Sequence, residues 1–131
     1  MFSTPHLDPT SSPVVVFILT ILAFASFYPL ILLIELVALQ LLRWGKFRAC
    51  LNVSWKMNAF TFMLGMVLLT IFPKPNAFHL LVYLAISVVV EMGVLSWFKR
   101  GAPRQNWTAA LIANAASYIL LIVPAFLFGN R

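Results

Sequence analysis

Four apolar stretches, each long enough to cross a lipid bilayer, occupy most of this chain. They cover residues 14–42, 49–72, 78–98 and 107–128, and a membrane-spanning helix needs about 20 residues. Only 9% of the residues are charged and 63% are hydrophobic, whereas a soluble domain has about 25% charged and about 45–50% apolar residues. The sequence therefore predicts an all-α, polytopic membrane protein with four transmembrane helices.

The net charge of +6 is concentrated in two of the predicted connections. The basic residues there are Arg43, Lys46 and Arg48 in the first connection, and Lys99, Arg100 and Arg104 in the third. Short loops that are rich in Lys and Arg stay in the cytoplasm. We therefore expect a multi-pass protein of the inner (cytoplasmic) membrane, with residues 43–48 and 99–104 cytoplasmic and both termini extracytoplasmic. Membrane topology accounts for the excess charge, so no nucleic-acid partner is predicted.

The chain contains an internal repeat that a shift of 56 residues reveals, because it places Glu35 on Glu91 without a gap. Over residues 35–72 the shift gives nine identities. The identical pairs are Glu35/Glu91, Leu39/Leu95, Gly45/Gly101, Arg48/Arg104, Asn58/Asn114, Ala59/Ala115, Leu64/Leu120, Val67/Val123 and Phe72/Phe128. Shared apolar composition explains matches of Leu or Val, but not Glu, Gly, Arg and Asn in one register. Each repeat is therefore interpreted as a helical hairpin closed by a basic turn that contains Gly.

This repeat sets the expected organisation of the chain. A polar extracytoplasmic tail covers residues 1–13, and the first two-helix repeat covers residues 14–72. An extracytoplasmic loop at residues 73–77 leads to the second two-helix repeat at residues 78–131. Because both hairpins cross the membrane in the same direction, a pseudo-twofold axis along the membrane normal should relate them, which is the parallel type of internal symmetry.

Polar residues inside the apolar stretches are expected to form one layer. Glu35 precedes Arg43 by eight residues, or about 12 Å along a helix, and Asn58 follows Arg48 by ten residues, or about 15 Å. The two side chains should therefore reach a similar depth across the hairpin. The second repeat places Glu91 and Asn114 in the same way, and Thr61 and Ser117 each lie three residues beyond their asparagine, on the same helix face. Each hairpin thus offers a carboxylate, an amide and a hydroxyl.

A carboxylate in hydrocarbon costs about 2.5–3.5 kcal/mol even on lenient scales, so it should face the bundle interior and be protonated or partnered. Lys56 lies at a depth close to that of Glu35, and we expect it either to pair with Glu35 or to extend back to the cytoplasmic interface. The second repeat has Ile112 at the equivalent position, so Glu91 has no such partner.

Two interpretations of this layer remain open at the level of sequence. In the first, the polar groups only hold helices together by hydrogen bonds, and the protein is an accessory or scaffolding subunit. Its partners would be the lipid bilayer and other membrane subunits or further copies of itself. In the second, Glu35 and Glu91 bind a proton or monovalent cation in a small transporter or channel. No phosphate loop, zinc spacing or nucleophile motif is present, so we predict neither enzymatic activity nor a metal or other cofactor.

Two further expectations concern aromatic and proline residues. The four tryptophans, Trp44, Trp55, Trp97 and Trp107, gather near the cytoplasmic side and are predicted to be interfacial anchors. Pro29 and Pro124 lie inside helical stretches and are expected to kink them.

Overall fold

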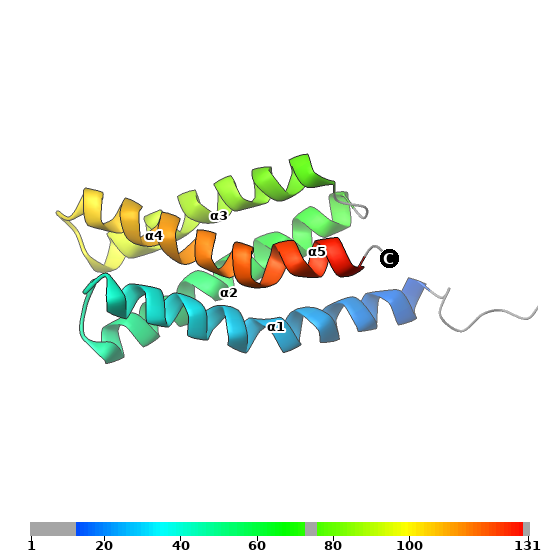
Figure 1. Cartoon of the computed structure of the whole chain (residues 1–131), viewed down its shortest axis with the longest axis horizontal. Coiled ribbons are helices and arrows are strands. Elements are labelled where there is room, and N and C mark those ends of the chain that lie inside the picture. Colours follow the sequence, from blue (N-terminus) through cyan, green and yellow to red (C-terminus); the bar gives the residue numbers. More distant parts are fainter. Residues whose placement is uncertain (1–12, 73–75, 130–131) are drawn as a thin grey trace, which may run out of the picture.

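The computed structural model describes residues 13–72 and 76–129, and this part of the chain contains helices and short turns only (Figure 1). The first three helices are α1 (Pro13–Leu41), α2 (Phe47–Ile71) and α3 (Ala77–Phe98). The fourth segment consists of α4 (Pro103–Ser117), the π-helical turn η2 (Tyr118–Ile122) and α5 (Val123–Gly129). The prediction of an all-α fold with four helical segments is therefore confirmed. Most of the expected tail at 1–13 and loop at 73–77 lies outside the described residues.

Within the part of the chain that the structure describes, two helical segments are long and apolar enough to cross a membrane, namely Ala77–Phe98 and Pro103–Phe128. In the first hairpin, Ala25–Leu41 forms a shorter apolar segment. A location in a membrane is thus supported by the second hairpin, whereas four spans and their orientation remain predictions.

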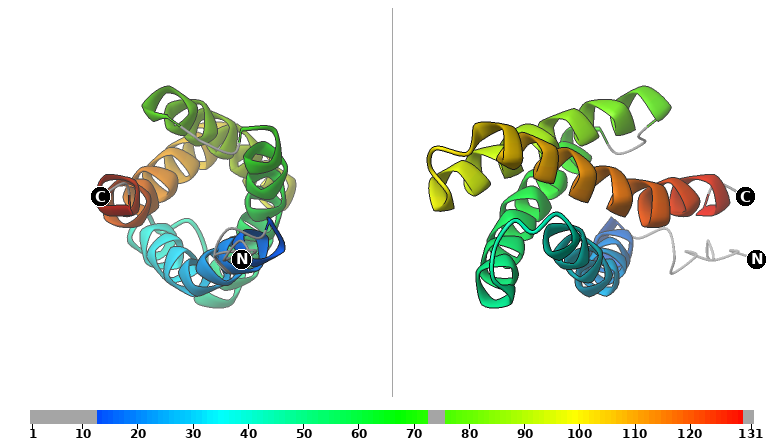
Figure 2. Two further views of the ribbon diagram at one scale, coloured as in Figure 1. Left: turned by 90° about the vertical axis from the view of Figure 1, so that its right-hand side faces the viewer. Right: turned by 60° about the vertical axis from the view of Figure 1, so that its left-hand side comes forward.

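The four segments form a ring in which each packs against two neighbours. Contacts join α1 to α2, α2 to α3, α3 to α4, and α4 back to α1, and the ring is visible in the view along the bundle (Figure 2, left). Consequently α1 and α3 lie across the ring from each other, as do α2 and α4. Both basic turns lie at one end of the bundle (Figure 1), which we call the basic end.

The buried core occupies only the half of the bundle nearest the basic end. Its apolar members include Leu36, Leu39, Trp44, Cys50, Val53, Met57, Val88, Leu95, Ala109 and Ala110. Among the described residues, no fully buried side chain of α1 precedes Glu35, and none of α2 follows Asn58. In the second hairpin, the first fully buried described residue of α3 is Val88, three residues before Glu91, and the last one of the fourth segment is Ser117. The glutamates therefore lie at the inner boundary of the packed core rather than at its centre.

The two basic turns use different residues to reverse the chain. In the second turn, Gly101 has a φ of 86°, a left-handed conformation that glycine adopts without strain. In the first turn the left-handed residue is Arg43, with a φ of 51°, and not Gly45. The amide of Trp44 donates to the carbonyl of Leu39, and that of Arg43 to the carbonyl of Gln40. This bond pattern is a Schellman motif, and it ends α1 without needing glycine.

A hydrogen-bond cluster with a buried Trp44–Asn106 bond joins the two turns. The indole Nε1 of Trp44 donates to Oδ1 of Asn106 at 2.9 Å, and Nδ2 of Asn106 donates to the carbonyl of Lys99 at 2.9 Å. Lys99 Nζ in turn donates to the carbonyl of Trp44 at 2.7 Å. We call these three residues the turn lock. The prediction that Trp44 is an interfacial anchor is wrong, because its side chain is 4% exposed and bonded inside the protein.

The other three tryptophans, Trp55, Trp97 and Trp107, are exposed, and their role as interfacial anchors stays a prediction. The two prolines have different surroundings. Pro29 lies within α1, which remains one α-helix. Pro124 follows η2, where the Val123 amide donates to the carbonyl of Tyr118, five residues earlier. Because proline clashes with the carbonyl four residues before it, a π-helical turn at this place accommodates Pro124.

The turn lock should contribute measurably to stability. Asn106→Ala removes the acceptor of a buried indole N–H, and an unsatisfied buried donor costs about 1–3 kcal/mol. We expect a loss of that size in equilibrium unfolding of the protein in mixed micelles. Asn52→Ala is the matched control, because Asn52 is an exposed asparagine of α2. Equal stability of the two variants would contradict the role given to the turn lock.

Candidate functional site: the glutamate–asparagine layer

Each hairpin contains one hydrogen bond between a glutamate and an asparagine. Asn58 Nδ2 donates to Glu35 Oε2 at 2.5 Å, and Asn114 Nδ2 donates to Glu91 Oε2 at 2.6 Å. The same nitrogens also donate to backbone carbonyls four residues earlier, of Ser54 and Ala110, both at 2.9 Å. Since a backbone carbonyl only accepts, these second bonds fix which side of each amide carries the nitrogen. Both asparagines therefore present donors to the carboxyl groups.

The four residues come from the four helical segments and alternate around the ring. The glutamates belong to α1 and α3, which lie across the ring from each other, and the asparagines belong to α2 and α4. All four side chains are 1–3% exposed. The two carboxyl groups, Glu35 and Glu91, are close enough to interact electrostatically. We call this set, together with Ser117, the polar layer.

The predicted hydroxyl groups differ between the repeats. Ser117 Oγ lies 3.3 Å from Glu35 Oε1 and 3.0 Å from the carbonyl oxygen of Asn114, so it reaches across to the other hairpin. Thr61 is bonded to the backbone carbonyls of Met57 and Asn58, at 3.1 and 3.3 Å. The structure thus brings Ser117 into the polar layer and leaves Thr61 bonded along its own helix.

The structure does not bring Lys56 to Glu35. Lys56 is exposed, and its Nζ lies 4.7 Å from the centre of the Phe98 ring. In the described part of the chain, the side chains that bond the Glu35 carboxyl group are Asn58 and Ser117. The physical reason is solvation: a long ammonium side chain places its charge outside the bundle, where it keeps its hydration and gains a cation–π contact.

Comparison with known proteins adds no family to this description. No family model matches this sequence, and no curated protein or solved structure matches it significantly. The chemistry of the polar layer therefore follows from its geometry alone.

This geometry forms a donor–acceptor network and differs from that of a cation site. A bound cation would need carboxylate and amide oxygens directed at one point. Here the amide groups of Asn58 and Asn114 direct nitrogen at the carboxyl groups, and backbone bonds hold them in that orientation. The arrangement can join helices, and its carboxyl groups can hold protons. Two surface pockets border other residues, such as Trp44 and Lys99 in one and Arg48 and Trp55 in the other.

Three polar residues beside the layer were not among the predicted site residues. Tyr118 interacts with Ser87 and lies within electrostatic range of Glu91 and Tyr83. The signal of Tyr83 and Ser87 in the sequence is the spacing of four that links them to Glu91 on one helix face, and this spacing does not include Tyr118. These three residues differ between the two halves of the chain, so a comparison of the repeats that looks for identical positions does not identify them.

The cross-hairpin bond of Ser117 should be worth more than the local bonds of Thr61. Ser117→Ala is expected to lower the free energy of unfolding by about 0.6–1.7 kcal/mol, from the average to the largest value for polar contacts between membrane helices. Thr61→Val keeps the side-chain shape and removes only bonds within α2, so its loss should be smaller. Unfolding by denaturing detergent gives the free energy of unfolding of both variants. A larger loss of stability in Thr61→Val than in Ser117→Ala would contradict this assignment.

Proposed function

We propose that this chain is a small four-span membrane protein that acts as an accessory or scaffolding subunit. It would work through contacts between its outer helix faces and other membrane proteins or further copies of itself. The polar layer would hold the two hairpins in register. The main support is the combination of an apolar exterior on every helix with polar groups that are bonded inside.

The exterior supports a function within the bilayer. Each helical segment exposes large apolar side chains to its surroundings, for example Leu33 at 54%, Met63 at 68%, Leu81 at 66% and Ile119 at 66%. Soluble monomers rarely expose apolar patches larger than a few hundred Å². Apolar surface on all four segments therefore favours lipid or membrane-protein partners, and the first hairpin would cross the membrane beside the second.

The interior supports a structural function of the polar layer. Each carboxyl group has an amide donor within its own hairpin, and Ser117 adds a bond from the second hairpin to Glu35. Polar contacts of this kind between membrane helices fix register and stabilise association. The layer thus has a complete physical role without a bound substrate.

The proposed topology places both basic turns in the cytoplasm and the α2–α3 connection outside. In a Cys50→Ala background, which removes the native cysteine, single cysteines would replace Lys46, Arg100 and Asn76. A membrane-impermeant maleimide added to intact spheroplasts should label the cysteine at position 76. The cysteines at positions 46 and 100 should react only after lysis. Labelling of either basic turn in intact cells would contradict the four-span topology.

Photo-crosslinking tests the accessory role one helix at a time. A photoreactive residue would replace Leu33, Met63, Leu81 or Ile119, one exposed position on each helical segment. In the native membrane, we expect a discrete protein adduct of fixed size from one or two of these positions and lipid adducts from the others. Lipid adducts from all four positions would contradict a subunit role.

A second candidate function is a proton-coupled transporter. The observation that favours it is the burial of two carboxyl groups, from α1 and α3, within electrostatic range of each other. Proteoliposomes with an imposed pH gradient distinguish the candidates. The accessory role predicts no proton flux above that of empty vesicles. Flux in the wild type that is lost in Glu91→Gln, with the fold retained, would replace the accessory role by transport.

A further inference from the structure

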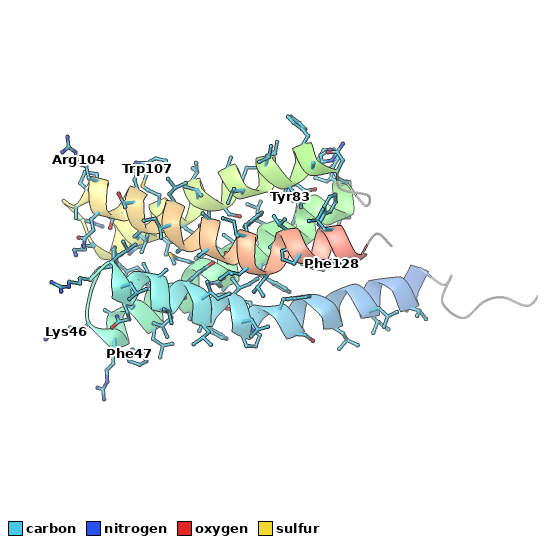
Figure 3. All side chains as sticks on the ribbon, in the orientation of Figure 1. Lys46, Phe47, Tyr83, Arg104, Trp107 and Phe128 are labelled. Carbon is cyan, nitrogen blue, oxygen red and sulfur yellow. The ribbon has the colours of Figure 1, made fainter. Side chains whose placement is uncertain are left out.

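Polar side chains form a line along one face of α3, from its N-terminus to the polar layer. His79, Tyr83, Ser87 and Glu91 follow one another at intervals of four residues, so each lies about one helical turn from the next. His79 is bonded to Asn76 in a capping box at the start of α3. Its ring centre lies 6.4 Å from that of Tyr83. The line therefore begins at the helix end opposite the basic end, where Figure 3 shows Tyr83 far from Lys46 and Arg104.

The first repeat has no such line, although it has the same scaffold. The shift of 56 residues places Phe27 at the position of Tyr83 and Ile31 at that of Ser87. It also places Phe62 at the position of Tyr118. Both phenols of the second repeat thus replace phenylalanines of the first, and the difference between the rings is the hydroxyl group alone.

The hydroxyl group of Tyr83 is not explained by stability. Its oxygen is buried and has no hydrogen-bond partner in the part of the chain that the structure describes. A buried polar group without a partner lowers the stability of the fold. Phenylalanine at the equivalent position of the first repeat shows that the scaffold accepts the ring without the oxygen. The Tyr83 hydroxyl group therefore points to a role other than packing.

Tyr118 brings a second phenol to the same region from the fourth segment. It interacts with Ser87 and lies within electrostatic range of both Glu91 and Tyr83. It is also the first residue of η2, which follows Ser117 directly. A π-helical turn shifts the side chains that follow it around the helix and is frequent at functional sites. In the first repeat, α2 continues as one α-helix through the equivalent residues 62–66.

The packing of the bundle leaves this region less buried than the basic end. In the described residues, no fully buried side chain of α3 precedes Val88, and none of η2 is fully buried. Tyr83, Ser87 and Tyr118 are all half-buried. Glu91 is therefore enclosed toward the basic end by the packed core and approached from the opposite end by hydroxyl groups.

We propose that Glu91 exchanges its proton with the aqueous phase at the α3 N-terminus through the hydroxyl groups of Tyr83, Ser87 and Tyr118. Each hydroxyl group accepts one proton and releases another, so it is unchanged after the transfer. The proton leaves the Glu91 carboxyl group, and the carboxylate is left behind. Transfer between neighbouring groups requires hydrogen-bonding distance or one intervening water molecule.

The groups that face Glu91 from each neighbouring element are compatible with this route. Across the ring is Glu35 from α1, α4 supplies Asn114, and η2 supplies Tyr118. On α2, the cation Lys56 is exposed and lies over Phe98. The first repeat has Phe27, Ile31 and Phe62 at the equivalent positions. The hydroxyl groups near Glu35 are those of Ser117, which belongs to the polar layer, and of Tyr28, which donates to the carbonyl of Trp55. We therefore expect Glu35 to exchange more slowly.

Infrared spectroscopy of the full chain in lipid nanodiscs tests the route. The C=O band of the protonated Glu91 carboxyl group is identified as the band that disappears in Glu91→Gln. After transfer to D2O, this band shifts to lower frequency as deuterium replaces the proton, and the time course of the shift gives the exchange rate. We expect Tyr83→Phe combined with Tyr118→Phe to slow this exchange about tenfold or more, equivalent to a barrier increase of about 1.4 kcal/mol. Phenylalanine at both equivalent positions of the first repeat indicates that this double variant folds.

Matched variants of the first repeat provide the controls. Tyr28→Phe removes a phenol of α1 whose hydroxyl group donates to the carbonyl of Trp55, and it should leave the Glu91 exchange rate unchanged. Phe27→Tyr combined with Phe62→Tyr should accelerate exchange at Glu35, whose band is the one lost in Glu35→Gln. Wild-type exchange rates in the Tyr83/Tyr118 double variant would overturn the route. So would the absence of any carboxylic acid band lost in Glu91→Gln.

Proton exchange at Glu91 is compatible with the accessory role and does not require transport. A slowed exchange in vesicles that show no proton flux would support the route together with the accessory role. Flux with an unaffected exchange rate would support transport and reject the route. The two results are read from separate measurements, so one proposal can fail without the other.

Discussion

The hydrogen bond between glutamate and asparagine in each hairpin is the interaction on which the remaining structure depends. A carboxyl group inside an apolar bundle is costly, and each of the two is placed next to an amide donor that is itself held by a backbone carbonyl. Because the glutamates and asparagines alternate around the ring, the bonds determine which helix faces point inward. They also fix the relative heights of the two helices in each hairpin. The packed core then fills the space between this layer and the basic turns.

Identical bonds in two hairpins would give a symmetric bundle, but the contacts between the hairpins are not symmetric. At the basic end, the turn lock uses Trp44 and Asn106, whose counterparts in the other repeat are Arg100 and Cys50. In the polar layer, Ser117 reaches Glu35, whereas Thr61 stays on its own helix. The bonds within one repeat involve residues that both repeats share. The contacts that join the two repeats involve equivalent positions at which the two repeats have different residues. The differences therefore accumulate at the interface between the hairpins and on the face of α3.

How much of this could be predicted from the sequence depends on the range of each interaction. The all-helical fold follows from long apolar stretches, and the helix rise brings Glu35 and Asn58 to similar depths. Neither the fold class nor these depths depend on the rotational orientation of each helix about its axis. The burial of Trp44 depends on that rotation and on Asn106, 62 residues away, so an aromatic residue beside basic residues resembled an interfacial anchor. Likewise, depth alone allowed a Lys56–Glu35 pair, but solvation favours an ammonium group outside the bundle.

Contacts between residues far apart in the sequence also explain why the two glutamates are chemically unequal, although the repeat places them at equivalent positions. Both have an amide donor, and within the layer Ser117 adds a bond to Glu35. A second difference lies in the half of the bundle beyond the layer. There the second repeat has Tyr83, Tyr118 and a π-helical turn, whereas the equivalent positions of the first repeat are Phe27 and Phe62 on regular α-helices. The Tyr83 hydroxyl group has no hydrogen-bond partner among the described residues, and a buried group of this kind lowers stability, so its presence requires a cause outside folding. A route for protons to one carboxyl group supplies that cause while the bonds of the layer keep the scaffold intact.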